Sequence, residues 1–399
     1  MTEKMRGVTL LADWDPREEY EPHPKDVEGE KTYLGSKVWR NPEMKIIEHE
    51  VPEPGPEEVL IEVKACGICG SDVHMAEADD DGYMLYPGLT GFPSILGHEF
   101  SGVVVDAGDE ALNKRTNEPF EPGEAVTSEE MLWCGQCKPC ADGYPNHCEN
   151  LDEIGINVDG AMADYIKVPS NTVWSIEPLR DVYEDEKELF KAGSLVEPTS
   201  VAYNAVIERG GGIRPGDNAV ICGGGPIGQA AVALMKRMGA ANVILSEPVD
   251  ERCALGTDFG ADHIIDPLEE DFAERVLELT AGQGADVFLE ATGLPNQVLP
   301  GIEDVIWRGS TLNSTVVIVA RADAKIKMTG EVYQVRRANI VGAQGHSGHG
   351  TFHRVIQSMA DGMNMNPIIT KEISLEEASG HIKQLRSDRS NCKISVIMD

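Results

Sequence analysis

The segment from Asn218 to Gly228 constrains the fold of this chain more than any other. An apolar run, Asn218 to Cys222, is typical of a buried strand, and the glycine pattern Gly223, Gly225, Gly228 follows it directly. Helical periodicity then starts at Ile227 and continues to Met238. A G-x-G-x-x-G loop between a strand and a helix predicts a pyrophosphate at the helix N-terminus, with Ile227 beside it. The alternative is a glycine-rich turn that holds no nucleotide.

Glu247 lies at the end of the next predicted strand, nineteen residues beyond Gly228. A carboxylate at this place can accept hydrogen bonds from the ribose hydroxyls and repels a 2′-phosphate. The sequence therefore predicts NAD rather than NADP as the cofactor. Arg252, five residues beyond Glu247, favours the alternative, because an arginine there can pair with a 2′-phosphate.

Strands and helices alternate from about Leu195 onward, which indicates βαβ units and an α/β domain with a parallel, doubly wound Rossmann-type sheet. The preceding part has β-like runs bounded by turn residues and predicts a mostly β barrel. We expect a catalytic domain over residues 1–198 with a lobe at 130–150, a nucleotide domain over 199–340, and a return to the first domain over 341–399. The acidic, proline-containing stretch 13–35 is expected to be a surface excursion between two strands.

Four of the nine cysteines stand within fifteen residues: Cys134, Cys137, Cys140 and Cys148. Cysteines at this spacing can surround one ion tetrahedrally, and four thiolates leave no open position for a substrate. The cluster thus predicts a structural zinc site that stabilises a surface lobe. Free thiols and an iron–sulfur cluster are the alternatives.

A second set of candidate ligands is spread over two segments. Cys69 lies in Cys66-Gly-Ile-Cys69-Gly-Ser71-Asp72-Val-His74, and His98 and Glu99 follow Gly97. One thiolate, one imidazole and one carboxylate make a zinc site with room for water, which is the composition of a catalytic site. A thiol redox pair of Cys66 and Cys69 is the weaker interpretation.

These motifs together resemble the zinc-dependent medium-chain alcohol dehydrogenases. The likeness covers almost the whole chain and includes Val196-Glu197-Pro198, which is similar to the segment of the polyol branch that contains sorbitol and butanediol dehydrogenases. The resemblance implies a GroES-like barrel domain beside the Rossmann domain, and one catalytic and one structural zinc per subunit. It also implies a dimer or tetramer. The roles that it implies are catalytic zinc ligands at Cys69, His98, Glu99 and Glu197, a proton relay at Ser71 and His74, and a hydrogen bond that the zinc-bound histidine donates to Asp72.

The resemblance also implies the reaction, a hydride transfer between a polyol or hydroxyketone and NAD. Overall likeness favours an enzyme of inositol breakdown. Butanediol or sorbitol/L-iditol dehydrogenase is the nearest alternative, and threonine dehydrogenase is less favoured. A protein that binds NAD and zinc without turnover is the alternative from another class.

The charge balance limits the partners. The chain has 68 acidic and 34 basic residues, so its formal charge is −34. Nucleic acids and anionic membranes would repel such a chain. No window approaches the about 18 consecutive apolar residues of a membrane span. We expect a soluble, cytoplasmic protein whose partner is a small-molecule substrate.

Overall fold

The computed structural model describes residues 3–322, 325–385 and 387–398. The chain divides into two compact units. Unit 1 comprises residues 1–197, 347–389 and 393–399, and unit 2 comprises 198–346 and 390–392. Unit 1 is therefore assembled from separate stretches of the sequence. Every helix among the described residues is too short or too polar to cross a bilayer.

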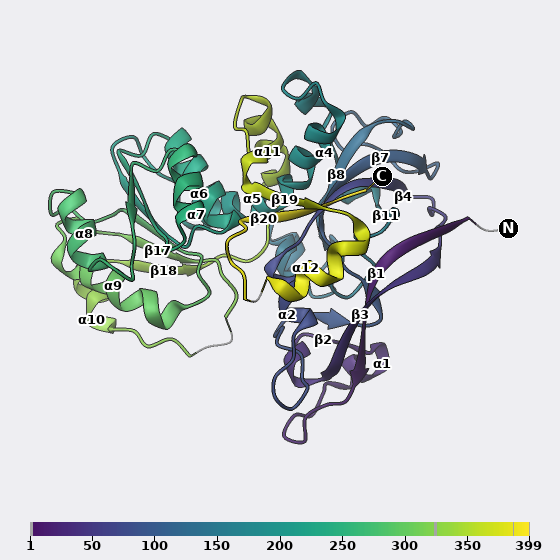
Figure 1. Cartoon of the computed structure of the whole chain (residues 1–399), viewed down its shortest axis with the longest axis horizontal. Helices are drawn as coiled ribbons and strands as arrows, with labels where there is room; N and C mark the ends of the chain where they lie inside the picture. Colours follow the sequence, from purple (N-terminus) through teal and green to yellow (C-terminus); the bar gives the residue numbers. More distant parts are fainter. Residues whose placement is uncertain (1–2, 323–324, 386, 399) are drawn as a thin grey trace. The chain divides into compact units, whose positions relative to one another are not determined.

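Unit 2 is built on a parallel sheet of six strands in the order β15-β14-β13-β16-β17-β18. Counted along the chain, this order is 3-2-1-4-5-6, the doubly wound arrangement of dinucleotide-binding folds. Helices connect successive strands (Figure 1), so the prediction of βαβ units is confirmed. The elements are β13 (Asn218–Cys222), α6 (Pro226–Arg237), β14 (Asn242–Ser246), α7 (Asp250–Asp258), β15 (His263–Ile265), α8 (Phe272–Leu279), β16 (Val287–Glu290), α9 (Pro295–Arg308), β17 (Thr315–Ile318), α10 (Gly330–Arg336) and β18 (Asn339–Gly342).

Unit 1 contains a sheet of seven strands with the order β12-β8-β7-β4-β20-β19, in which β11 also pairs with β4. The last strand, β20, lies between β4 and β19, antiparallel to β4 and parallel to β19. The C-terminal segment thus contributes an internal strand to a sheet that begins near the N-terminus. The strands are β4 (Glu58–Gly67), β7 (Glu99–Ala107), β8 (Ala125–Ser128), β11 (Tyr165–Pro169), β12 (Val173–Ser175), β19 (Ile369–Ile373) and β20 (Lys393–Ile397).

A second sheet of unit 1 joins β1, β3 and β6. Residues 13–35 lie at the connection between β1 and β3, as expected, but they also contain a short helix and a short strand that pairs with β5. The remaining strands and α-helices are β1 (Lys4–Trp14), α1 (Pro24–Gly29), β2 (Lys31–Thr32), β3 (Trp39–Glu50), α2 (Gly70–Ala76), β5 (Thr90–Gly91), β6 (Ser94–Ile95), β9 (Met131–Leu132), α3 (Lys138–Ala141), β10 (Asp152–Glu153), α4 (Glu186–Ser194), α5 (Val196–Tyr203), α11 (Thr351–Ala360) and α12 (Ala378–Gln384).

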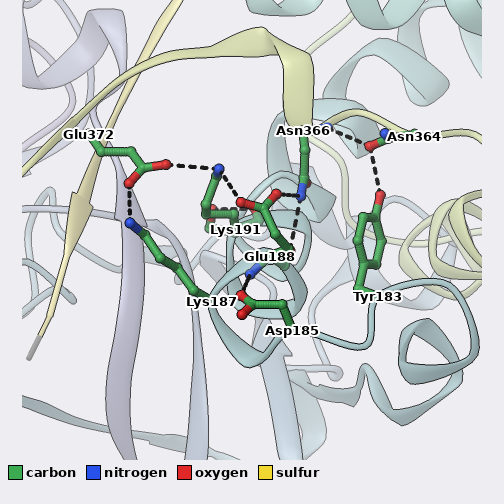
Figure 2. A network of polar contacts seen from close by, with 9 residues as sticks. Tyr183, Asp185, Lys187, Glu188, Lys191, Asn364, Asn366 and Glu372 are labelled. Carbon is green, nitrogen blue, oxygen red and sulfur yellow. Dashed lines mark hydrogen bonds and ion pairs between the residues drawn. The ribbon is translucent and has the colours of Figure 1, made fainter.

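A polar network connects α4 to the returning segment of unit 1 (Figure 2). The Lys191 Nζ atom lies 2.7 Å from Glu188 Oε1 and 2.8 Å from Glu372 Oε1. The Asn366 amide donates to the second carboxylate oxygen of Glu188 at 2.7 Å, and the Tyr183 hydroxyl donates to Asn364. Because these contacts join residues far apart in the sequence, they hold the C-terminal stretch against α4.

Candidate active site

Cys69 is placed by the start of α2. It is the N-cap residue of this helix, and its backbone N–H donates to Asp72 Oδ2 at 2.8 Å. Asp72 thereby satisfies a backbone donor at the helix start. The Cys69 side chain therefore lies at the N-terminus of α2, where the backbone N–H groups of the first turn are directed toward it.

His98 and Glu99 are placed by the start of β7, and two glycines make room for them. Gly97 has φ +95°, and a Cβ there would lie 2.7 Å from Cys66 Sγ. A Cβ on Gly67 would lie 2.2 Å from Glu99 Oε2. Both glycines are therefore required for the close packing around His98 and Glu99, whose residues are each 2% exposed.

The structure brings Cys69, His98 and Glu99 together. One ligand atom of each lies within 4.8 Å of the others. Burial lowers the pKa of His98, but the nearby charges of Glu130 and Cys69 raise it well above its usual value. A buried thiol, imidazole and carboxylate at this spacing fit a zinc ion, which would take the place of the proton on the imidazole.

Lys393 is a residue of this site that sequence reasoning missed. Its Nζ atom lies 2.7 Å from Glu99 Oε1 and also donates to the carbonyl oxygen of Ile68 at 2.9 Å. Burial lowers the pKa of Lys393, but Glu99 and Cys69 raise it more, so the ammonium stays charged. The only local indication in the sequence is a lysine within the β-like run at 392–397.

Two further buried carboxylates lie near the cluster. Burial and the charge of Glu99 raise the pKa of Glu197 well above its usual value. Burial also raises the pKa of Glu130, the second residue that sequence reasoning missed. Oxygens of Glu130 and Glu197 lie within 4.8 Å of one another. This crowding of carboxylates in a buried region fits a site that holds a cation.

The two predicted relay residues differ in their surroundings. Ser71 Oγ lies 3.3 Å from His98 Nε2 and so belongs to the cluster. His74 is exposed, and desolvation and the charge of Arg389 lower its pKa.

The expected hydrogen bond between Asp72 and His98 is wrong for this structure: within its described residues, Asp72 Oδ1 and His98 Nδ1 have no hydrogen-bond partner. Asp72 caps α2 instead.

The four-cysteine lobe also has the geometry of a metal site. Ligand atoms of Cys134, Cys137, Cys140 and Cys148 all lie within 4.8 Å of one another. Backbone N–H groups donate to the sulfurs, for example from Cys137 to Cys134 Sγ at 3.4 Å. Hydrogen bonds, the first from Gln136, lower the pKa of Cys134 to about 6, and burial raises that of Cys140 to about 12. Four thiol groups in such proximity fit a structural zinc, which would balance their charge.

In unit 2 the glycine loop has the conformation that its pattern requires. Gly223 has φ +102°, and a Cβ on Gly228 would lie 1.9 Å from the Gly223 carbonyl oxygen. Gly225 is the N-cap of α6 and has open space where a Cβ would be. Pro226 occupies the first turn, and Ile227 follows it. The loop therefore leaves the helix N-terminus accessible to a phosphate.

Glu247 and Arg252 lie beside this loop. Glu247 accepts the backbone N–H of Gly224 at 2.6 Å and that of Val249 at 3.0 Å. Arg252 donates to the Asn391 carbonyl oxygen at 2.9 Å. These bonds hold the Glu247 carboxylate at the end of β14, where a ribose is expected in this fold.

Comparison with protein families gives two matches. The model of the alcohol dehydrogenase GroES-like domain matches residues 55–178, and the model of the zinc-binding dehydrogenases matches residues 226–361. The first match contains Cys69, His98 and the four-cysteine lobe, and the second contains Gly228, the last glycine of the loop, and Glu247.

Individual relatives extend the likeness to nearly the whole chain. Scyllo-inosose 3-dehydrogenase of Thermotoga maritima is 64% identical over 396 residues, 98% of this chain and 100% of that protein. L-threonine 3-dehydrogenase of Caldanaerobacter subterraneus is 33% identical and covers 83% of this chain and 89% of its own length. A solved structure from Thermotoga maritima, 64% identical, has a TM-score of 0.95 and covers 98% of this chain and 100% of its own. One from Sinorhizobium meliloti, solved with NADP, is 26% identical with a TM-score of 0.77 and 99% coverage of both chains.

Proposed function

Because the chain belongs to the zinc-dependent medium-chain alcohol dehydrogenases, which are NAD(P)-linked oxidoreductases, we propose that it interconverts a cyclic polyol and its ketone, with scyllo-inosose as the ketone. The proximity of Cys69 and His98, whose ligand atoms lie within 4.8 Å of each other in a buried cluster, carries the proposed chemistry. The 64% identity with a scyllo-inosose 3-dehydrogenase supports the choice of substrate.

The residues have distinct parts in this reaction. A bound zinc ion supplies a Lewis acid that makes an alcohol easier to deprotonate, and the nicotinamide accepts or returns the hydride. Cys69, His98 and Glu197 would hold the metal, whereas Glu99 is engaged by Lys393. Ser71, beside His98 Nε2, would accept the hydroxyl proton of the substrate, and the exposed His74 would exchange it with solvent.

The cofactor is proposed to be NAD. The Glu247 carboxylate is buried and held by two backbone N–H groups, so it cannot easily turn away from a 2′-phosphate. Repulsion between these two anions disfavours NADP. The NADP in the Sinorhizobium meliloti structure is the reason to test both cofactors.

A cytoplasmic location and a dimeric or tetrameric assembly are further parts of the proposal.

The test is a substrate panel with both cofactors. The purified enzyme is supplied with scyllo-inosose, myo-inositol, sorbitol, 2,3-butanediol and L-threonine, and the absorbance of NADH or NADPH is followed. We expect the highest kcat/KM with the cyclic substrates and NAD. Turnover of butanediol or threonine alone would refute the proposed substrate. That outcome would favour the butanediol branch or the activity of the threonine-oxidising relative.

A further inference from the structure

A short π-helix in unit 2 carries an inference beyond the residues assigned so far. It comprises Asn204–Arg209 and directly follows α5. The N–H of Gly210 donates to the carbonyl oxygen of Ala205 at 2.8 Å, which is the i→i−5 spacing of a π-helix. The segment packs against β17 and β18. Turns of this kind are rare and are frequent at functional sites.

Two side chains of the π-helix bind the backbone at the end of β18. The Asn204 amide nitrogen donates to the carbonyl oxygens of Gly345 at 2.8 Å and of Gln344 at 3.2 Å. The Arg209 Nε atom donates to the carbonyl oxygen of Gly342 at 2.8 Å. In an α-helix, residues five apart point about 140° away from each other. Because the π turn is wider, Asn204 and Arg209 lie closer to one side and reach the same stretch of chain.

This stretch leaves the sheet just before the atoms that Asn204 holds. The N–H of Ala343 donates to the carbonyl oxygen of Ile318 at 2.9 Å, which continues the pairing of β18 with β17 by one residue. Gly345 then has φ +58°, a left-handed conformation that turns the chain. Asn204 is 6% exposed, so few water molecules can replace these carbonyl oxygens as its acceptors. Asn204 therefore fixes the path of the chain beyond β18.

The same stretch lies at the edge of the sheet where a dinucleotide binds. In the doubly wound order of unit 2, each half of the sheet binds one mononucleotide at the carboxyl ends of its strands. The glycine loop and Glu247 assign the adenosine to the half with β13, β14 and β15. The nicotinamide half of the cofactor is thereby left to β16, β17 and β18, and residues 343–346 directly follow β18.

The bonds of Asn204 also orient the peptide groups of this stretch. In a trans peptide, the C=O and the N–H of the next residue point in opposite directions. Because Asn204 holds the carbonyl oxygens of Gln344 and Gly345, the N–H groups of Gly345 and His346 point away from Asn204. The nicotinamide carries a carboxamide, whose oxygen accepts hydrogen bonds from N–H groups. One side chain thus sets the direction of two backbone donors.

We propose that Asn204 is a positioning residue for the nicotinamide half of the cofactor, because it holds the chain at 344–346 so that its backbone donors bind the nicotinamide. The inference rests on the NAD-linked function proposed above. Loss of the Asn204 donor should therefore weaken the binding of NADH but not that of ADP-ribose. ADP-ribose has the adenosine, the pyrophosphate and the second ribose of the cofactor but lacks the nicotinamide.

The test compares the Kd values of NADH and ADP-ribose, measured by calorimetric titration of the full-length wild type, Asn204→Leu and Asn218→Leu. Leucine keeps the branched shape of asparagine but has no donor. We expect Asn204→Leu to raise the Kd of NADH about three- to tenfold, and that of ADP-ribose less than about twofold. Asn218→Leu is the matched control. The buried Asn218 amide also donates to a backbone carbonyl oxygen, that of Gly284, but at the start of β13 and thus at the opposite edge of the sheet. This control should leave the ratio of the two Kd values unchanged.

A folded Asn204→Leu protein in which both Kd values are unchanged, or rise by the same factor, would overturn the inference. If Asn204→Leu does not fold, a crystal structure of the wild type with NADH decides. A hydrogen bond from the backbone N–H of Gly345 or His346 to the nicotinamide supports the assignment, and a nicotinamide that contacts none of residues 343–346 refutes it. Failure of the proposed function is distinguishable: the wild type would then bind neither ligand, or would bind both and reduce none of the cyclic ketones.

Discussion

The ion pair between Lys393 and Glu99 allows a quantitative prediction. The Nζ and Oε1 atoms are 2.7 Å apart, which corresponds to an attraction of about 6 kcal/mol at an effective dielectric constant of about 20. Desolvation of two buried ions offsets most of this, at several kcal/mol per ion. Removing one partner, however, leaves the other charge buried alone. We therefore expect Lys393→Met to lower the free energy of unfolding of unit 1 by about 3–5 kcal/mol.

The assay is urea denaturation followed by tryptophan fluorescence in a fixed excess of zinc. Trp14, Trp39, Trp133 and Trp174 lie in unit 1 and only Trp307 in unit 2, so the fluorescence reports mainly on unit 1. The control is Lys167→Met, which breaks a more exposed pair with Glu58 and should cost about 1 kcal/mol or less.

A double variant then isolates the interaction. Glu99→Gln combined with Lys393→Met removes both charges, and most of the lost stability should return. The reasoning is refuted if Lys393→Met costs less than about 1 kcal/mol, or if the double variant is as unstable as the sum of the two single variants.

The remaining predictions concern the two metal sites, the cofactor and the polar network. Cys69→Ala should abolish turnover but keep NADH binding, measured by NADH absorbance and by fluorescence titration; normal turnover after metal removal would contradict the ligand assignment. Cys140→Ser should lose one zinc per chain by elemental analysis and lower the thermal midpoint, while the folded fraction keeps kcat within severalfold, because this site has no open position. Glu247→Ser should reduce the preference for NAD over NADP at least about tenfold in kcat/KM, and an unchanged ratio would show that Arg252 or another group sets it. Lys187 and Lys191 lower the pKa of Glu372. The stabilisation from this carboxylate is therefore complete above its unfolded pKa of about 4.3 and is lost as the pH falls through its lower folded value. Glu372→Gln should accordingly cost about 1 kcal/mol at neutral pH and little at pH 3; an equal cost at both would mean that charge is not involved.

Much of this fold could be predicted from local sequence. The parallel sheet of unit 2 follows from short apolar runs separated by helical segments, and β13 was predicted with the bounds that the structure has. The four-cysteine site and the glycine loop could also be predicted from the sequence, because each is a contiguous motif with its own stereochemical requirement. Cys69 and His98 belong to two such motifs, and their ligand types predict a shared zinc site.

Lys393 and Glu130 could not be predicted in this way. Lys393 reaches Glu99 across 294 residues because β20 pairs with β4, and no local pattern specifies that pairing. Glu130 is one of two adjacent glutamates, and only the fold determines that one faces His98 and the other Trp174. The incorrect prediction for Asp72 has a similar cause. Family resemblance implied a hydrogen bond with His98, but the Asp72 carboxylate instead accepts the Cys69 N–H at the start of α2.

The position of β20 has a consequence for synthesis on the ribosome. Every strand of the parallel sheet in unit 2 lies between residues 218 and 342, so this sheet can form while the rest of the chain is still being translated. Translation of unit 1 begins earlier, but its folding cannot be completed until residues 393–397 have emerged. Only then does its central strand β4 gain its neighbour β20. Until then Glu99 lacks its ammonium partner. The half of the protein that is made first is therefore the half that can finish folding last.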